Sequence, residues 1–158
     1  MDYPSWDSFE ALLYDLSRRP GEKGGPNSVP LISPARYKDG TTRSNANVEY
    51  WASWCAMDVD SFVIENDDKI DLRRKIEEVV GDHYFLCYST AGSTKDHPKF
   101  RLVFPLQSNV MAKDIPHFWH ALNCTITEIG DKQTKDLSRM FYIPALYPDA
   151  YNFFFRHK

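Results

Sequence analysis

The sequence predicts an α+β domain in which helices pack against an antiparallel sheet. From Val48 onward, short apolar segments typical of strands alternate with longer segments in which apolar residues recur at helical spacing. The chain has 158 residues, which is enough for one buried core but too few for two comfortable domains. Apolar residues make up 42% of the chain and aromatic residues 15%, so the chain has the material to form such a core.

The N-terminal region, residues 1–48, is expected to add one helix and a long loop to the domain. In residues 5–18 apolar side chains recur at helical spacing, and Ser5 stands where a helix N-cap is expected. Residues 19–47 contain much of the glycine and proline of the chain, and this composition predicts irregular structure.

The core region, residues 49–158, carries the alternating pattern. Strands are predicted at 49–60, 83–90, 99–106, 139–145 and 151–155, and helices at 67–80 and 112–124. Gly81 directly follows the first of these helices, in the position of a C-terminal cap. Up to residue 145 the order strand, helix, strand, strand, helix, strand suits a single antiparallel sheet with helices packed on one face, as in ferredoxin-like or RRM-like folds.

Charge and cysteine usage restrict the function classes. The formal net charge is -3, so any contact with nucleic acid must come from a local cluster of positive charge or from metal ions that neutralise carboxylates. The three cysteines stand far apart, which argues against a zinc site and a disulfide framework. Neither a signal peptide nor an apolar run of membrane-spanning length is visible. We therefore expect a soluble protein of the cytoplasm, with no membrane partner.

Two aspartates at the end of a predicted strand are the strongest local signal. Strand side chains alternate between the two sides of a sheet, so Asp58 and Asp60 should point the same way while Met57 and Val59 face the opposite layer. Neighbouring carboxylates repel each other unless a cation lies between them. The pair therefore predicts a Mg²⁺ or Mn²⁺ site, of the two-metal kind that suits in-line phosphoryl transfer, although a plain strand end entering a turn explains it equally well.

A second cluster combines basic residues with a histidine. If the chain stays extended through Pro98, the side chains at alternate positions from 95 to 101 share one face, and the predicted nucleotide-binding residues are Lys95, His97, Lys99 and Arg101. Ser93 lies just before them and is expected to add a hydroxyl group. An ordinary strand with one solvated face is the alternative explanation.

A third cluster precedes the predicted strand at 139–145. Asp131 and Asp136 are both candidates for a further metal ligand, because a hard cation needs more than two carboxylates. Arg139 is a candidate phosphate ligand. The sequence favours Asp131 of the two aspartates, and a charged surface loop remains the alternative explanation for the whole segment.

Taken in this order, the three clusters resemble the archaeo-eukaryotic primase superfamily. Its members carry an Asp-x-Asp or Asp-x-Glu pair on a strand, then a Ser-x-His-like loop, then a third acidic residue ahead of a basic strand. The segments 99–106 and 136–144 look especially like primase domains encoded by phages and mobile elements. The resemblance covers about residues 50–145. It departs from the family pattern in the histidine motif, where two residues separate Thr94 from His97.

The resemblance implies a DNA-dependent nucleotidyltransferase. In that family the carboxylates bind divalent metal ions, and the histidine with its basic neighbours holds the phosphates of an incoming NTP or dNTP. The expected activity is therefore the synthesis or extension of short primers on a single-stranded DNA template, in some members beside a helicase domain. For a viral chain the expected location is the host cytoplasm.

Two other function classes remain open on the sequence alone. The first is a metal-dependent nuclease or replication initiator, although the histidine and tyrosine pattern of rolling-circle initiators is absent. The second is a non-catalytic RRM-like module that binds nucleic acid on its sheet. Such a module needs no pair of aspartates on one face and is expected to carry more positive charge.

Overall fold

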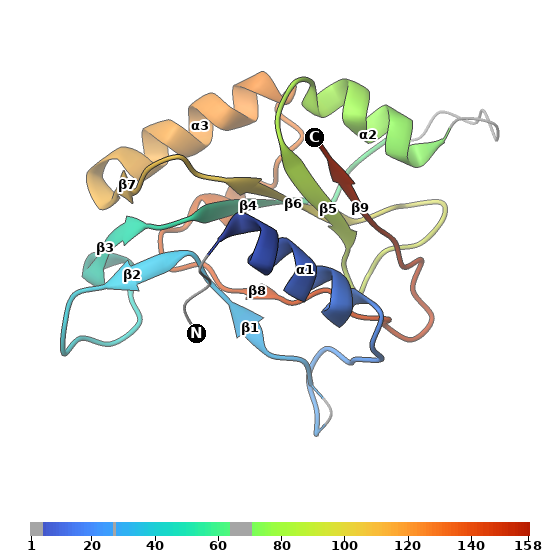
Figure 1. Cartoon of the computed structure of the whole chain (residues 1–158), viewed down its shortest axis with the longest axis horizontal. Coiled ribbons are helices and arrows are strands. Elements are labelled where there is room, and N and C mark those ends of the chain that lie inside the picture. Colours follow the sequence, from blue (N-terminus) through green and yellow to red (C-terminus); the bar gives the residue numbers. More distant parts are fainter. Residues whose placement is uncertain (1–4, 27, 64–70) are drawn as a thin grey trace.

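The computed structural model describes residues 5–26, 28–63 and 71–158, and these residues form an α+β structure with antiparallel sheets (Figure 1). The α-helices are α1 (Trp6–Ser17), α2 (Leu72–Val80) and α3 (Ile115–Thr125). The strands are β1 (Leu31–Ile32), β2 (Ala35–Tyr37), β3 (Val48–Trp51), β4 (Trp54–Val59), β5 (Phe85–Ser89), β6 (Phe100–Pro105), β7 (Val110–Met111), β8 (Phe141–Tyr142) and β9 (Phe154–His157). The predicted α+β class is thus confirmed. None of the helices in the described residues has the length and apolar character needed to span a membrane.

The largest sheet has four strands in the order β4-β6-β5-β9, and all its neighbours are antiparallel. Strands β4 and β5 both run opposite to β6, so they are parallel to each other, and α2 connects them across the intervening strand. A ferredoxin-like sheet would place its last strand beside its first. Here β9 pairs with β5 at the opposite edge, while the segment at Asp131 lies against the end of β4.

The predicted single sheet is wrong, because two further sheets are present. Strands β2, β3 and β7 form one of them, and β1 pairs with β8 in the other. The predicted strand 49–60 is divided into β3 and β4 at Ser53, whose φ of 71° lies in the left-handed region. The predicted loop 19–47 contains β1 and β2, whose pairing partners come from later parts of the chain.

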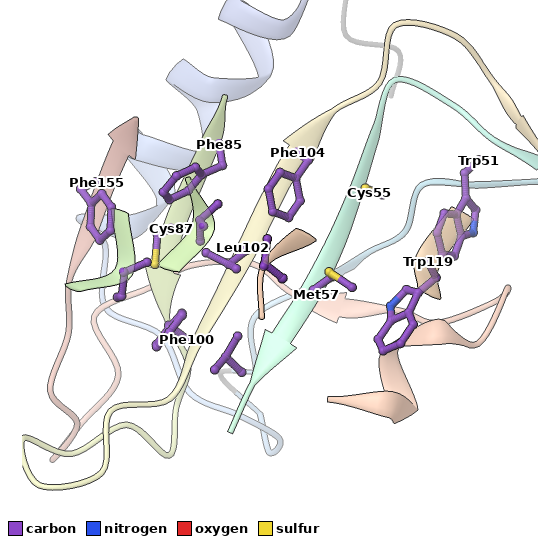
Figure 2. Close-up of a cluster of buried hydrophobic side chains, with 14 of the residues drawn as sticks. Trp51, Cys55, Met57, Phe85, Cys87, Phe100, Leu102, Phe104, Trp119 and Phe155 are labelled. Carbon is purple, nitrogen blue, oxygen red and sulfur yellow. The ribbon is translucent and has the colours of Figure 1, made fainter. Parts of the chain in front are cut away.

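Helices cover both faces of the four-stranded sheet, so the expectation that they share one face is also wrong. Helices α2 and α3 pack on one face over a wholly apolar cluster. Figure 2 shows the side chains that β4, β5 and β6 contribute to this cluster. Helix α1 packs on the other face, where Phe9 and Leu13 contact a second cluster that contains Trp54, Leu86 and Val103. Because both faces are covered, every residue of β4 is buried.

Local signals set the helix ends largely as predicted. The Ser5 hydroxyl oxygen accepts a hydrogen bond from the Ser8 N–H at 3.1 Å and caps α1. Helix α2 begins after its N-cap Asp71 and ends at Gly81, which has a φ of 76°. The first residues of the predicted helix 67–80, up to residue 70, lie outside the described residues.

Candidate active site

The end of β4 carries the first two predicted site residues. Met57 and Val59 belong to the apolar cluster under α2 and α3, as the alternation predicted. Asp58 points to the opposite face, where its side chain is buried against Arg101. Asp60 follows the strand directly and is exposed to solvent. The strand therefore presents one buried and one accessible carboxylate.

Asp131 is brought to the same place by a hydrogen bond between backbones. Its N–H donates to the Asp58 carbonyl oxygen at 2.6 Å, and its carboxyl group is within hydrogen-bonding reach of that of Asp60. Asp131 also caps the 3-10 helix Lys132–Lys135, where its Oδ1 accepts a hydrogen bond from the Gln133 N–H. Asp136 stands exposed at the other end of this short helix. Of the two candidates for the third acidic position, the structure places Asp131 beside Asp60.

A buried side chain of α3 holds the turn that precedes Asp131. The Asn123 Oδ1 accepts a hydrogen bond from the Gly130 N–H at 2.8 Å, and a Cβ atom at position 130 would lie only 2.7 Å from that oxygen. A larger residue at position 130 would displace the Asn123 side chain and disturb this hydrogen bond. Thr127 and Glu128, in the same turn, both have a φ of 58°, which is an unfavourable conformation for residues with a side chain.

The carboxyl group of Asp60 is partly buried and lies among other carboxyl groups. Partial burial raises the pKa of Asp60, and the charge of Asp58 and the hydrogen bond and charge of Asp131 raise it further. Only Lys99 acts in the opposite direction among the groups that affect this pKa most. A cation between Asp60 and Asp131 would relieve this repulsion.

Arg101 is placed differently from what the sequence predicted. It is 6% exposed, and its Nε and Nη2 donate to the two carboxylate oxygens of Asp58, its partner across the strands β4 and β6. Its Nη1 donates to the carbonyl oxygen of Tyr142 at 2.6 Å and to the hydroxyl group of Tyr88 at 3.3 Å. Burial raises the pKa of Tyr88, so this hydroxyl group stays protonated. Arg101 is thus part of the protein interior.

The loop that precedes β6 does not form the predicted row of alternating side chains. The Thr94 hydroxyl oxygen accepts from the His97 N–H, and the His97 carbonyl oxygen accepts from the Thr94 N–H, so the chain turns here instead of staying extended. Lys95 and His97 are exposed on this turn, while Lys99 is half-buried. Ser93 is 1% exposed, and its hydroxyl oxygen accepts from the Lys99 N–H at 3.1 Å. Ser93 therefore closes the loop and does not face the solvent.

Arg139 approaches the site from the segment that precedes β8. Its Nη2 lies 4.0 Å from Asp58 Oδ2, and its side chain is 34% exposed. The indole N–H of Trp51 donates to the carbonyl oxygen of Leu137, and Asn45 Oδ1 accepts from the backbone and hydroxyl groups of Ser138. These contacts to β3 and to the 3-10 helix Asn45–Asn47 hold the segment beside the carboxylates.

The residues present fit a Mg²⁺ site that substrate phosphates complete better than a metal site built from protein ligands alone. Across the described ranges 5–26, 28–63 and 71–158, no group of three or more His, Cys, Asp or Glu side chains is arranged to hold a metal ion. At this site Asp58 is engaged by Arg101. Mg²⁺, however, is commonly held by one or two carboxylates together with substrate phosphates and water. Asp60 and Asp131 fit that donor set, which the phosphates of a nucleotide would complete.

Sequence reasoning missed Tyr88 and Tyr142, which complete the hydrogen bonds around Arg101. Tyr88 lies directly opposite Arg101 in the register of β5 and β6, and Tyr142 lies in β8. Strand register depends on pairing between distant segments, so no local pattern points to these two residues.

Two cavities lie elsewhere on the molecule, along α1 and β9. The larger has a volume of about 650 Å³ and is lined by both elements and by Arg73, and the smaller has about 190 Å³. None of the predicted site residues lines either cavity.

Comparison of the chain with protein-family models, with curated proteins and with solved structures finds no match in any of the three.

Proposed function

We propose that this chain is a metal-dependent nucleotidyltransferase of the primase or primase-polymerase type, which synthesises or extends short primers on single-stranded DNA. The observation that supports this proposal most strongly is the convergence of Asp60 and Asp131 next to Asp58. Asp60 and Asp131 come from two distant segments of the chain. The primase resemblance implies that the acidic residues of both segments bind the same metal. The charge of Lys99 acts on Asp60, and Arg139 lies close to Asp58.

The reaction joins the 3′-oxygen of a primer to the α-phosphorus of an NTP or dNTP. The new O–P bond forms as the bond to the β-phosphate breaks, pyrophosphate leaves, and the hydroxyl proton passes to solvent. Mg²⁺ or Mn²⁺, when bound, would supply charge neutralisation and a more acidic 3′-hydroxyl group. Asp60 and Asp131 would hold the metal, and Lys99 and Arg139 would stabilise negative charge on the phosphates.

The loop before β6 is the proposed phosphate-binding segment. Lys95 and His97 are exposed on its turn, so a triphosphate can reach both. The buried hydroxyl group of Ser93 and the hydroxyl group of Thr94 shape this loop through backbone hydrogen bonds. A preformed loop loses less conformational entropy when it binds a ligand.

The finer assignment of the fold is part of the same proposal. The primase resemblance implies a strand that ends in the acidic pair, a basic loop that precedes a neighbouring strand, and a third acidic residue beside them. Strand β4, the loop before β6 and Asp131 follow that arrangement. We further propose a helicase domain or subunit as a partner and the cytoplasm as the place of action.

A primer-synthesis assay tests the proposal. Wild-type protein is incubated with single-stranded DNA, labelled NTPs or dNTPs, and Mg²⁺ or Mn²⁺. Asp60→Asn and Asp131→Asn should each reduce product by at least about a hundredfold, because each removes half of the carboxylate pair. Asp82→Asn is the matched control, since Asp82 is an exposed aspartate in the turn between α2 and β5.

Other outcomes point to other functions. Metal-dependent cleavage of DNA without added nucleotide would indicate a nuclease or replication initiator. DNA binding that is indifferent to metal, with no product from any nucleotide, would indicate a non-catalytic module. Equal activity of Asp60→Asn and the wild type would overturn the proposed mechanism.

A further inference from the structure

Asp58 and Asp60 are two residues apart but lie in different environments. Asp58 is 7% exposed, and both of its carboxylate oxygens accept hydrogen bonds from Arg101. Asp60 is exposed and faces another carboxyl group, that of Asp131. Asp58 and Asp60 are therefore expected to have different roles.

Arg101 is held from several sides, so it cannot easily release Asp58. Its Nη1 donates to the Tyr142 carbonyl oxygen and to the Tyr88 hydroxyl group. The guanidinium carbon lies 4.9 Å from the centre of the Phe141 ring and 5.5 Å from that of Tyr88, which is the geometry of cation–π contacts. A fork of two parallel hydrogen bonds to a carboxylate is the strongest pairing that an arginine makes.

We propose that Asp58 is a positioning residue and not a ligand of the metal ion. The inference rests on the proposed function, since it concerns the metal site of that reaction. The Asp58–Arg101 ion pair fixes the end of β4, from which Asp60 projects. The Asp58 backbone carbonyl accepts from the Asp131 N–H and so places the second carboxylate. Among the residues that the structure describes, Asp60 and Asp131 supply the oxygens that bind the metal.

The pair also ties the site to the rest of the fold. Through Arg101 the end of β4 is connected to β5 at Tyr88 and to β8 at Tyr142. Strand β8 follows the segment that carries Arg139, whose Nη2 approaches the same Asp58 carboxylate. A change at Asp58 is therefore expected to move Asp60, Asp131 and Arg139 together.

The protein is titrated with Mn²⁺ alone, and electron paramagnetic resonance measures the concentration of the free ion. The affinities of the variants then distinguish metal ligands from positioning residues. Asp60→Asn should weaken Mn²⁺ binding by more than about a hundredfold, since one of two carboxylates is lost. The double variant Asp58→Leu/Arg101→Met replaces the buried pair by apolar side chains of similar size, which buried ion pairs often tolerate. It should weaken binding by no more than about tenfold, the lower end for residues that only orient ligands.

Thermal unfolding accompanies these measurements. Asp58→Leu alone leaves Arg101 buried without its partner and should lower Tm by roughly 10 °C. The double variant should recover most of that loss. If the double variant is folded and its Mn²⁺ affinity falls as far as that of Asp60→Asn, Asp58 is a ligand and the proposal is wrong.

A second measurement on the wild-type protein does not depend on any variant folding. The Nε–H proton of Arg101 should give a downfield, slowly exchanging nuclear magnetic resonance signal, assigned through its contacts with the Phe141 ring. Saturating Mg²⁺ should leave this signal in place, because the ion pair persists. Loss of the signal on metal binding would show that Asp58 leaves Arg101 for the metal, and would overturn the proposal.

The same experiments separate this inference from the proposed function. If the wild type binds Mn²⁺ and only the positioning result fails, the nucleotidyltransferase proposal stands with a different set of ligands. If neither the wild type nor Asp82→Asn binds Mn²⁺, even with a nucleoside triphosphate present, the metal site itself is absent and both proposals are overturned.

Discussion

The two faces of the four-stranded sheet are built from the same strands but differ in chemistry. On the face under α2 and α3, β4 and β6 contribute only apolar side chains, among them Met57 and Leu102 (Figure 2). On the face under α1, the same strands are apolar at one end and carry Asp58 and Arg101 at the other. Alternation along a strand thus lets one face stabilise the fold while the other builds a polar site.

The two faces differ in how strictly each limits the residues that it can accept. An apolar face needs only volume and shape, and many hydrophobic substitutions of similar size satisfy it. The polar end of the other face needs each donor matched with an acceptor, because an unpaired buried charge is costly. Substitutions on the two faces should therefore fail in different ways.

The largest expected effect is the loss of stability when Arg101 or Leu102 is substituted. These two residues are neighbours in β6 and point to opposite faces of the sheet. Leu102→Ala should cost about 2–5 kcal/mol of the free energy of unfolding through the cavity it creates. Arg101→Ala should cost about 3–5 kcal/mol, because it leaves the Asp58 carboxylate buried without a partner. Urea denaturation monitored by tryptophan fluorescence measures both.

A second substitution distinguishes the two causes. Adding Asp58→Leu to Arg101→Ala should recover part of the lost stability, since the uncompensated charge disappears. Adding it to Leu102→Ala should increase the loss, because it then leaves Arg101 unpaired as well. Equal behaviour in both backgrounds would show that the two faces do not differ as described.

A smaller effect of opposite sign is expected at Asp60. The pKa of Asp60 is higher in the folded protein than its ordinary value of 3.8, so protonation of this group favours the folded state. Asp60 therefore favours folding most at low pH. This contribution is lost as the pH rises from 3.8 through the raised pKa of the folded state. Without divalent metal at pH 7, Asp60→Asn should therefore stabilise the protein. The gain should stay below about 1 kcal/mol, since solvent screens this largely exposed group.

Differential scanning calorimetry at pH 3 and pH 7 checks the sign. The gain in Tm should be present at pH 7 and nearly vanish at pH 3, where Asp60 is protonated in both the folded and unfolded states. A loss of stability at pH 7 would mean that Asp60 forms a favourable interaction instead of a repulsive one.

Thiol reactivity probes the apolar face without changing its stability. Burial raises the pKa of Cys55 to about 12 and also raises that of Cys87, while Cys124 on α3 is exposed. Native protein should therefore react with a chromogenic disulfide at one thiol per chain, and denatured protein at all three. Rapid reaction of a second thiol in the native state would contradict the tight packing of this face.

Much of the fold follows from local pattern. The helical spacing in residues 5–18 and the cap at Ser5 predict α1, and Gly81 marks the end of α2. The short strands β1 and β2 escape prediction, because two or three residues carry no periodicity and are stabilised by partners distant in sequence.

The candidate site is likewise predicted only in part from the local pattern. The sequence favours Asp131 over Asp136, and the structure places Asp131 beside Asp60. The expected row from Lys95 to Arg101 is wrong, because Thr94 and His97 close a turn and Arg101 enters the interior. Whether these residues bind a nucleotide stays a prediction that the proposed assays test.

Local sequence is enough to fix which residues of β4 and β6 share a face, because side-chain alternation is a property of the backbone of one strand. It also fixes that acidic residues end the first of these strands. The position of Arg101 opposite Asp58, and the hydrogen bond from the Asp131 backbone to that of Asp58, arise only in the folded chain. Those relations depend on strand register and on the path of distant loops, which are set by packing across the whole domain.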